Sequence, residues 1–193
     1  MQKFLVSIAI VIFTYVYAEA QQFGIKTNLI YDATASPSLG AEISVAPKWS
    51  LELTGNLNAW DMSHDRKWKH WFIQPEVRYW LCEALHGHFF GMHLLGGQYN
   101  FGGFGYDGKL FGIDFDNLRT HRHQGWAVGG GFNYGYAWLL QKHWNIEAEL
   151  GVGYLYTRYD EYQCAGCGKR KRKGVKKNYV GPTEIAVNLE YLF

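Results

Sequence analysis

The sequence has few cysteines and no long apolar run beyond its N-terminal segment. Only 3 of its 193 residues are cysteine, whereas a structural zinc site usually takes four Cys or His ligands. After Ala20, no segment approaches the roughly 20 apolar residues that a transmembrane helix needs, and the mean hydropathy is −0.24. A membrane location would therefore require a closed β-sheet, because only helices and closed sheets satisfy their backbone hydrogen bonds in lipid.

The N-terminal segment has the organisation of a secretory signal peptide. Lys3 supplies positive charge, residues 4–17 form a short apolar core, and Ala18-Glu19-Ala20 is a small-x-small cleavage site. We expect residues 1–20 to be the signal peptide and residues 21–193 to form one mature domain. No cysteine stands directly after the cleavage site, so a lipoprotein is not expected. An uncleaved anchor is the alternative.

What the sequence does contain is alternation of apolar and polar side chains, which is clearest between Trp126 and Tyr159. Two arms, joined by a short polar turn, place aromatic or aliphatic residues at every second position, with mostly small or polar residues between them. A strand sends successive side chains to opposite faces, so each arm would have one apolar and one small or polar face. Outer-membrane barrels require this pattern, because lipid contacts one face and the lumen the other.

Other segments alternate in the same way and raise the expected number of strands to eight, with long loops at Asp61–His70, Asn100–His123 and Asp160–Asn178. Pro75 predicts a bulge or a local loss of pairing. This arrangement indicates an all-β, eight-stranded, antiparallel up-and-down transmembrane β-barrel. A soluble barrel of the lipocalin type is the alternative. The strands are expected at residues 23–32, 38–46, 49–60, 71–81, 88–99, the two arms of 126–159, and 179–193.

Two turns have the same chemistry. Pro47-Lys48-Trp49 and Lys142-His143-Trp144 each follow one alternating arm and open another. Brief turns are typical of the periplasmic side of outer-membrane barrels. We therefore predict that both turns lie at the same end, with Trp49 and Trp144 at the inner membrane interface.

Four short stretches carry a family resemblance: Lys26-Thr27-Asn28-Leu29, Gly87-His88-Phe89-Phe90-Gly91, Gly96-Gly97-Gln98-Tyr99-Asn100 and Gly181-Pro182-Thr183. With them, the mature chain resembles a family of small Bacteroidetes outer-membrane barrels known as domain of unknown function 3575. The last strand, which ends in Phe193, also resembles the signal by which such barrels are recognised for insertion. The resemblance implies a barrel in the bacterial outer membrane and assigns no activity.

Charged residues collect on the face expected to line the lumen. An eight-stranded barrel is just wide enough for side chains to fill it, and buried charges must pair or be hydrated. We predict a lumen polar network that closes the barrel. The excess of carboxylates leaves open a path for protons or small ions. The network is expected to contain Lys26, Glu42, Glu52, Glu76, Arg78, Glu147, Glu149 and Glu184, with Glu190 on the same face.

The cysteines favour a disulfide. Cys164 and Cys167 form a CxxC in an exported loop, and an oxidising compartment favours a bond between them. The alternatives are a metal site completed by His121 and His123, or a redox thiol. Cys82 is left as an unpaired thiol or an intermolecular partner.

A basic run follows the CxxC. Such a run is often only a solvated loop, but on an outer-membrane surface it would contact lipopolysaccharide phosphates. Nucleic-acid binding is not expected, because no aromatic residue interrupts the run. The expected contact residues are Lys169, Arg170, Lys171, Arg172, Lys173, Lys176 and Lys177.

These observations predict a non-enzymatic, monomeric outer-membrane barrel without a cofactor, metal or catalytic site. It would present the loops Asn100–His123 and Asp160–Asn178 to lipopolysaccharide, a surface polymer or a partner protein. One alternative is a lipid-modifying or proteolytic barrel, and another is a narrow pore. Ser63-His64-Asp65 has the residue types of a triad, but adjacent residues cannot adopt its geometry. The candidate catalytic residues at the rim are His64, Asp65, His70, His121 and His123.

Overall fold

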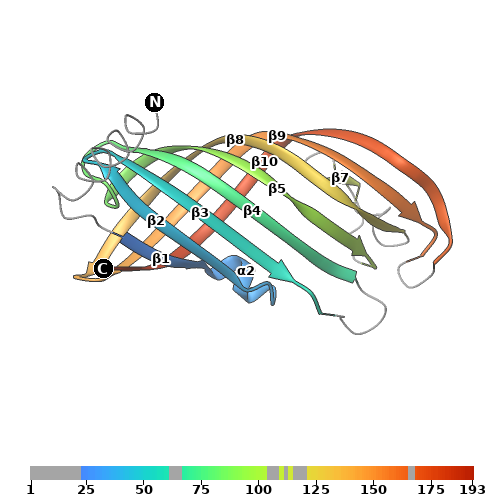
Figure 1. Cartoon of the computed structure of the whole chain (residues 1–193), viewed down its shortest axis with the longest axis horizontal. Coiled ribbons are helices and arrows are strands. Elements are labelled where there is room, and N and C mark those ends of the chain that lie inside the picture. Colours follow the sequence, from blue (N-terminus) through green and yellow to red (C-terminus); the bar gives the residue numbers. More distant parts are fainter. Residues whose placement is uncertain (1–22, 61–66, 104–108, 111–112, 115–120, 165–167) are drawn as a thin grey trace, which may run out of the picture.

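The computed structural model describes residues 23–60, 67–103, 109–110, 113–114, 121–164 and 168–193. The expected signal peptide, Ser63-His64-Asp65 and Cys167 lie outside these residues. Within them, eight strands are hydrogen-bonded as a closed barrel in the order β1-β10-β9-β8-β5-β4-β3-β2 (Figure 1). Every neighbouring pair in the ring is antiparallel. The predicted all-β, up-and-down arrangement of eight strands is confirmed.

The barrel strands differ greatly in length. They are β1 (Phe23–Asn28), β2 (Ser38–Ala46), β3 (Trp49–Asn58), β4 (Lys67–Trp80), β5 (Gly87–Gly102), β8 (Arg122–Gln141), β9 (Trp144–Tyr162) and β10 (Arg170–Leu192). A five-residue helix, α2 (Leu29–Ala33), follows β1. A separate hairpin is formed by β6 (Lys109–Leu110) and β7 (Ile113–Asp114). Among the described residues, no helix is long and apolar enough to cross a membrane.

The period-two pattern sets which side chains face the lumen. On β9, Leu150 and Val152 point outward and are 66% and 64% exposed, whereas Glu147 and Glu149 point inward and are buried. The same alternation on the other strands gives the barrel an apolar outer surface and a polar interior. Large apolar side chains are exposed on every barrel strand from β1 to β10. In a soluble protein, most such side chains are buried in the core.

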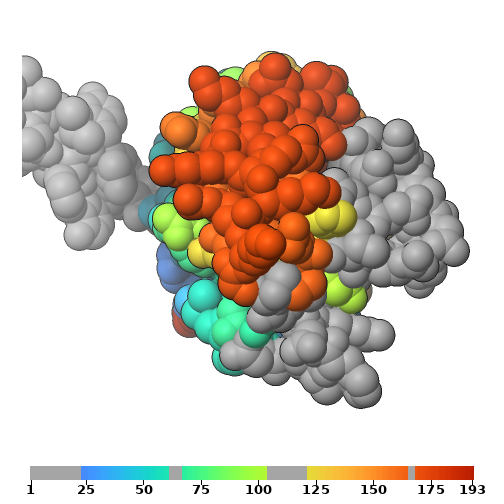
Figure 2. Space-filling view, turned by 90° about the vertical axis from the view of Figure 1, so that its right-hand side faces the viewer, coloured from blue at the N-terminus to red at the C-terminus, as the bar shows by residue number. Residues whose placement is uncertain are grey.

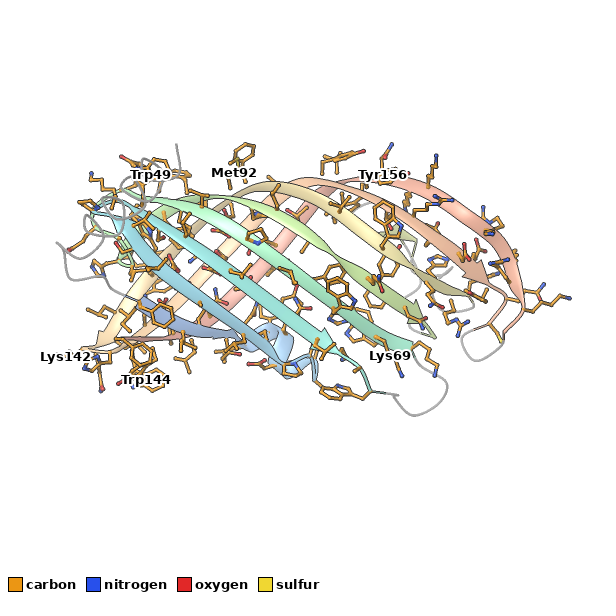
Figure 3. The ribbon with its side chains drawn as sticks, in the orientation of Figure 1. Trp49, Lys69, Met92, Lys142, Trp144 and Tyr156 are labelled. Atoms are coloured by element: carbon orange, nitrogen blue, oxygen red, sulfur yellow. The ribbon has the colours of Figure 1, made fainter. Side chains whose placement is uncertain are left out.

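The short turns lie together at one end, called here the turn end. The Phe193 N–H donates to the Phe23 carbonyl at 2.9 Å, and the Leu192 N–H donates to the His143 carbonyl at 2.8 Å. Trp49, Lys142 and Trp144 all lie toward this end in Figure 3. The prediction that the two similar turns share an end is confirmed. The opposite end is called the loop end.

The predicted first strand, residues 23–32, is wrong beyond Asn28, because α2 begins there. The Asn28 side chain accepts a hydrogen bond from the Ile30 N–H at 3.0 Å and caps the helix. Asp32 accepts hydrogen bonds from the Thr27 hydroxyl at 2.6 Å and from the Ser38 N–H at 3.1 Å. These local side-chain bonds compete with the sheet and end β1 early.

The predicted loop Asp160–Asn178 is also wrong, because most of it is strand. Lys176 pairs with Arg158, and Arg170 pairs with Tyr162, across the ladder between β9 and β10. The register shifts between Arg172 and Val175, where Gly174 has a φ of +64°. A β-bulge at this point lets the hairpin bend while the ladder continues.

Other strand boundaries also move outward. β4 begins at Lys67, inside the predicted loop 61–70, and β5 and β8 take residues from both ends of the predicted loop 100–123. The prediction at Pro75 is confirmed, because pairing between β4 and β5 stops at Ile73–Gly96 and resumes at Glu76–His93.

The wall of the barrel is uneven in height. β1 and β2 have 6 and 9 residues, whereas β8, β9 and β10 have 20, 19 and 23. The long strands therefore rise beyond the rest at the loop end (Figure 1). Figure 2 looks at this end, and residues of β9 and β10, in orange and red, cover much of its centre. We call the projecting part of β8, β9 and β10 the extension.

Candidate functional site

The lumen is closed at the turn end by apolar side chains. Trp80 and Phe89 are fully buried, with ring centroids 4.6 Å apart. The Arg78 guanidinium lies 4.4 Å from the Phe89 ring centroid, so charged groups begin directly above this layer. The layer consists of Trp80, Ala84, Leu85, Phe89, Ala137 and Leu192.

Lys26 forms the first centre of charge above this layer. Its ammonium donates to Glu42, to Glu52 at 2.9 Å and to Glu147 at 2.6 Å, and lies 3.6 Å from Glu190. The Lys26 side chain is 1% exposed. All three donor positions of the ammonium are thus used within the barrel.

Arg78 forms the second centre, and its side chain has no exposed surface. Its Nη1 lies 2.9 Å from Glu42, and its Nη2 lies 2.7 Å from Glu52 and 2.8 Å from Glu149. Its Nε lies 2.6 Å from Glu76. The fixed fork of the guanidinium therefore binds carboxylates from β2, β3, β4 and β9 at once.

Amide side chains complete the network. Asn188 donates to Glu147 at 3.3 Å and to Glu149 at 3.2 Å, and Asn145 donates to Glu190 at 3.0 Å. The structure brings together every residue that the sequence placed in the lumen. We call this set the lumen network: Lys26, Glu42, Glu52, Glu76, Arg78, Glu147, Glu149, Glu184 and Glu190.

Carboxylates outnumber cations in the lumen network. Two buried cations, Lys26 and Arg78, face six glutamates that are also buried, and Glu184 adds a seventh with a side chain that is 9% exposed. An uncompensated charge in a medium of low dielectric is costly. Protons or an additional cation must therefore neutralise part of the excess.

Glu76, His93 and Glu184 form a separate group within the lumen, and each offers one ligand atom within 4.8 Å of the others. Glu76 and His93 are register partners on β4 and β5. Glu184 reaches them from β10, where a bulge lies between Pro182 and Glu184. Arg78 pairs with Glu76 at 2.6 Å, but among the described residues no Lys or Arg pairs with Glu184. This group therefore differs from the one around Lys26, whose ammonium pairs with Glu42, Glu52 and Glu147.

The lumen holds little free space above the network. A cavity of about 30 Å³, with room for about two water molecules, is lined by Lys26, Tyr31, Glu52 and Glu184, among others. Nearer the loop end, aromatic rings fill the interior. The rings of Trp68 and Phe101 stack at 4.5 Å, and His70 packs 5.7 Å from the rings of Phe72 and Phe101.

The extension carries a second group of charges, which we call the rim cluster: Asp160, Glu161, Arg170, Lys171 and Arg172. Arg170 lies 3.0 Å from Asp160, Lys171 lies 3.3 Å from Glu161, and Arg172 also pairs with Glu161. The Gly174 N–H and the Arg170 guanidinium hold the pKa of Asp160 below its ordinary value. At Glu161, burial acts to raise the pKa. The hydrogen bonds from Arg172 and Lys171 outweigh burial, so the pKa of Glu161 is lowered.

The rim histidines have different surroundings. Burial lowers the pKa of His123 to about 4, and its ring lies 4.6 Å from that of Tyr159. His121 Nε2 lies 2.8 Å from the Lys171 ammonium and 3.7 Å from Glu161. His70 lies in the aromatic interior instead. His64 and Asp65 lie outside the described residues.

Aromatic residues form two belts on the outer surface. At the turn end, Trp49 packs on Tyr79 and Trp144 packs on Tyr191, with ring centroids 5.0 and 5.2 Å apart. Toward the loop end, the rings of Trp126 and Tyr156 are 5.6 Å apart, and Trp71 is 41% exposed. Between the belts the exposed side chains are aliphatic or aromatic, including Leu53, Leu94, Val128, Phe132, Leu150 and Val152.

Cys82 and Cys164 lie at opposite ends of the barrel. Cys164 is disulfide-bonded, and because Cys167 lies outside the described residues, the pairing between them stays a prediction. Cys82 is a free thiol and is exposed at the turn end.

A comparison with known protein families identifies the family of this chain. Residues 4–193 match the model of a family described as a protein of unknown function, DUF3575. The chain belongs to this family. The predicted membership of DUF3575 is therefore confirmed, and the family description assigns no activity. No curated protein and no solved structure matches this DUF3575 chain.

Sequence reasoning missed His93 and Thr183. The Thr183 hydroxyl lies 3.0 Å from His93 Nε2, although 90 residues separate them in the chain. β5 is rich in glycine, so its two faces could not be told apart by alternation alone. Counting back from the short turn between β4 and β5 would have placed His93 opposite Glu76, so the length of that turn was the useful signal.

Proposed function

We propose that this DUF3575 chain is a closed, non-enzymatic β-barrel of the bacterial outer membrane that presents its extension to lipopolysaccharide. The observation that carries the proposal is the apolar outer surface between two aromatic belts. Tryptophan and tyrosine favour the interfaces between membrane and water, and lipid-facing bands of outer-membrane barrels have this composition.

The spacing of the belts fits a bilayer. Trp144 and Tyr156 are about twelve residues apart on β9, which corresponds to roughly 40 Å along a strand. A strand tilt of about 40° reduces this to a height of about 30 Å, comparable with the roughly 25 Å apolar band of outer-membrane barrels. The signal peptide proposed for residues 1–20 would deliver the chain to the envelope.

The filled lumen supports an anchoring role rather than a pore. The apolar layer that contains Trp80 closes one end of the lumen. Above it, the ion pairs of Lys26 and Arg78 leave a cavity of about 30 Å³. Conduction of solutes would require this network to open, and breaking a buried ion pair is strongly unfavourable.

Several cations of the extension are available to anionic ligands. Lys173 and Lys176 are exposed and form no ion pair among the described residues. Lys176 pairs in register with Arg158, which lies next to Trp126 across the sheet. These cations therefore lie just beyond the upper aromatic belt, at the height expected for lipid A phosphates. Arg170, Lys171 and Arg172 are engaged in the rim cluster and would contribute less.

Binding to vesicles that contain lipopolysaccharide tests the proposal. We expect the double variant Lys173→Glu/Lys176→Glu to lose at least about tenfold in affinity, since each basic residue near an anionic surface contributes about 1 kcal/mol. Lys142→Glu is the matched control, because it reverses an exposed charge at the turn end, and its affinity should stay unchanged. The proposed contact would be contradicted if the double variant bound as tightly as the unchanged chain. It would also be contradicted if the double variant and Lys142→Glu lost the same affinity.

A further inference from the structure

We propose that Glu76, His93 and Glu184 bind a divalent transition-metal ion such as Zn²⁺ inside the barrel. One imidazole nitrogen and two carboxylates are a ligand set that suits such ions. Their candidate ligand atoms already lie within 4.8 Å of one another, so small rotations of the side chains would bring them to coordination distance.

Two polar atoms of this group lack a hydrogen-bond partner. Glu76 Oε2 and His93 Nδ1 are both buried and unsatisfied, on side chains whose residues are 3% and 0% exposed. Native proteins rarely leave such atoms without a partner, and a bound ion would supply the contact that both atoms lack. His93 Nδ1 lies 3.1 Å from Glu184 Oε2 but is not aligned for a hydrogen bond with it.

The surrounding side chains hold the ligands in place. His93 Nε2 contacts the Thr183 hydroxyl at 3.0 Å, which fixes the ring so that Nδ1 faces Glu184. Gln74 and Asn133 donate to the two oxygens of Glu184. Metal-binding histidines usually have such a partner on the second nitrogen, which orients the ring.

Two irregularities of the sheet occur at this place. The ladder between β4 and β5 is interrupted at Gln74 and Pro75, and β10 has a bulge between Pro182 and Glu184. Bulges re-aim side chains and are common next to functional sites. Here the bulge on β10 accompanies the contact of Thr183 with His93 and of Glu184 with Gln74, whereas the register between β4 and β5 is the same on both sides of their interruption.

The group around Lys26 provides an internal contrast. Glu42, Glu52 and Glu147 are also close enough to hold an ion, but the Lys26 ammonium already donates to all three. A cation is therefore built into that group by the chain itself. The group at His93 has two carboxylates, of which Glu76 pairs with Arg78 at 2.6 Å. Among the described residues, Glu184 pairs with no Lys or Arg, and no cation pairs with all three members of the group, so we expect selective metal binding there.

Metal titration of the purified, folded barrel in detergent tests this site. After treatment with a chelator, we expect the chain to take up one Zn²⁺ and, with Co²⁺, to give a visible absorption band from a low-coordinate site with a nitrogen ligand. His93→Gln and Glu184→Gln should each weaken Zn²⁺ binding by at least about 100-fold, as removal of a ligand exceeds the typical effect of its supporting partners.

Glu190→Gln is the control, because it removes another buried carboxylate from the lumen network outside this group. Its affinity for Zn²⁺ should stay within about threefold of the unchanged chain. Folding of each variant is checked by the change in gel mobility on heating. A folded, unchanged chain that takes up neither Zn²⁺ nor Co²⁺ would overturn the proposal, whatever the variants do. So would Zn²⁺ binding that is equally strong without His93 and without Glu184.

Discussion

The lumen network and the rim cluster use the same ionisable residue types in opposite surroundings. In the lumen, the side chains of Lys26 and Arg78 are 1% and 0% exposed. In the rim cluster, those of Arg170 and Arg172 are 46% and 55% exposed. The lumen network has seven carboxylates with two cations, and the rim cluster has two carboxylates with three cations, so the groups differ in charge balance as well as in access to water.

This difference decides what each group can contribute. Water screens an exposed ion pair, so the pair adds little stability and its cations remain available to other anions. A buried cation cannot exchange its partners for water, so the lumen network specifies which strands meet and closes the barrel. We infer that the lumen network serves stability, whereas the exposed cations of the extension, Lys173 and Lys176 above all, serve contact.

Replacing Arg78 with Met should produce the largest effect. The substitution removes a guanidinium that lies within 2.9 Å of Glu42, Glu52, Glu76 and Glu149. It leaves Glu76 and Glu149 without a Lys or Arg partner among the described residues. We expect the free energy of unfolding to fall by about 3–5 kcal/mol, measured by urea unfolding of the folded barrel in detergent micelles.

Lys173→Met is the matched control for that measurement. It removes an exposed cation that has no ion pair among the described residues. The free energy of unfolding should therefore change by less than about 0.5 kcal/mol. Similar losses in both variants would erase the distinction between the lumen network and the exposed cations of the extension.

Acidification should loosen the extension before the rest of the barrel. Unfolded histidine titrates near pH 6.5, whereas burial lowers the pKa of His123 to about 4. Local unfolding therefore takes up a proton between these values, and the stability that neutral His123 supports is lost as pH falls from about 6.5 to 4. Because the pKa of Glu161 is also lowered, the extension loses further stability at pH values below the ordinary pKa of a glutamate.

Proteolysis of the hairpin between β9 and β10 measures this effect. The rate of cleavage should rise by up to about tenfold per pH unit across that window, the limit for one proton, after correction for the protease's own pH dependence. His123→Phe keeps an aromatic ring beside Tyr159 and should flatten the profile above pH 5. An unchanged profile in His123→Phe would show that this histidine does not govern the extension.

Arg170→Ala should have the smallest effect. Its ion pair with Asp160 at 3.0 Å joins side chains that are 46% and 26% exposed, and ion pairs in contact with water contribute about 0–1 kcal/mol. We expect a decrease of less than about 1 kcal/mol in the local stability of the extension, measured by hydrogen exchange. A loss as large as that expected for Arg78→Met would mean that the rim cluster is structural.

The strands that span the apolar band could be predicted because their two faces differ. Leu150 and Val152 alternate with glutamate and glycine on β9, so both the strand and its lumen face are visible in the sequence. The carboxylates of the lumen network follow from the same parity. How they pair could not be predicted, because Lys26 and Arg78 reach across the lumen to residues from several strands.

The extension could not be predicted, because neither of its faces is consistently apolar. On β10, Arg172 faces inward toward Glu161 and Lys176 faces outward, so charge occurs on both faces and the alternation disappears. A strand that is polar on both sides has the composition of a solvated loop. The helix after Asn28 was missed for a local reason, since its cap and the bonds of Asp32 involve single side chains.

Membrane insertion is tested most directly by refolding the purified mature chain in two separate samples. One sample contains lipid vesicles, and the other contains buffer without lipid or detergent. The proposal predicts that the chain folds only in the presence of lipid or detergent, migrates differently on gels before and after heating, and has Trp126 and Trp144 quenched by brominated lipids. A folded monomer that stays soluble in plain buffer, with no heat-dependent migration and no quenching by lipid, would contradict it.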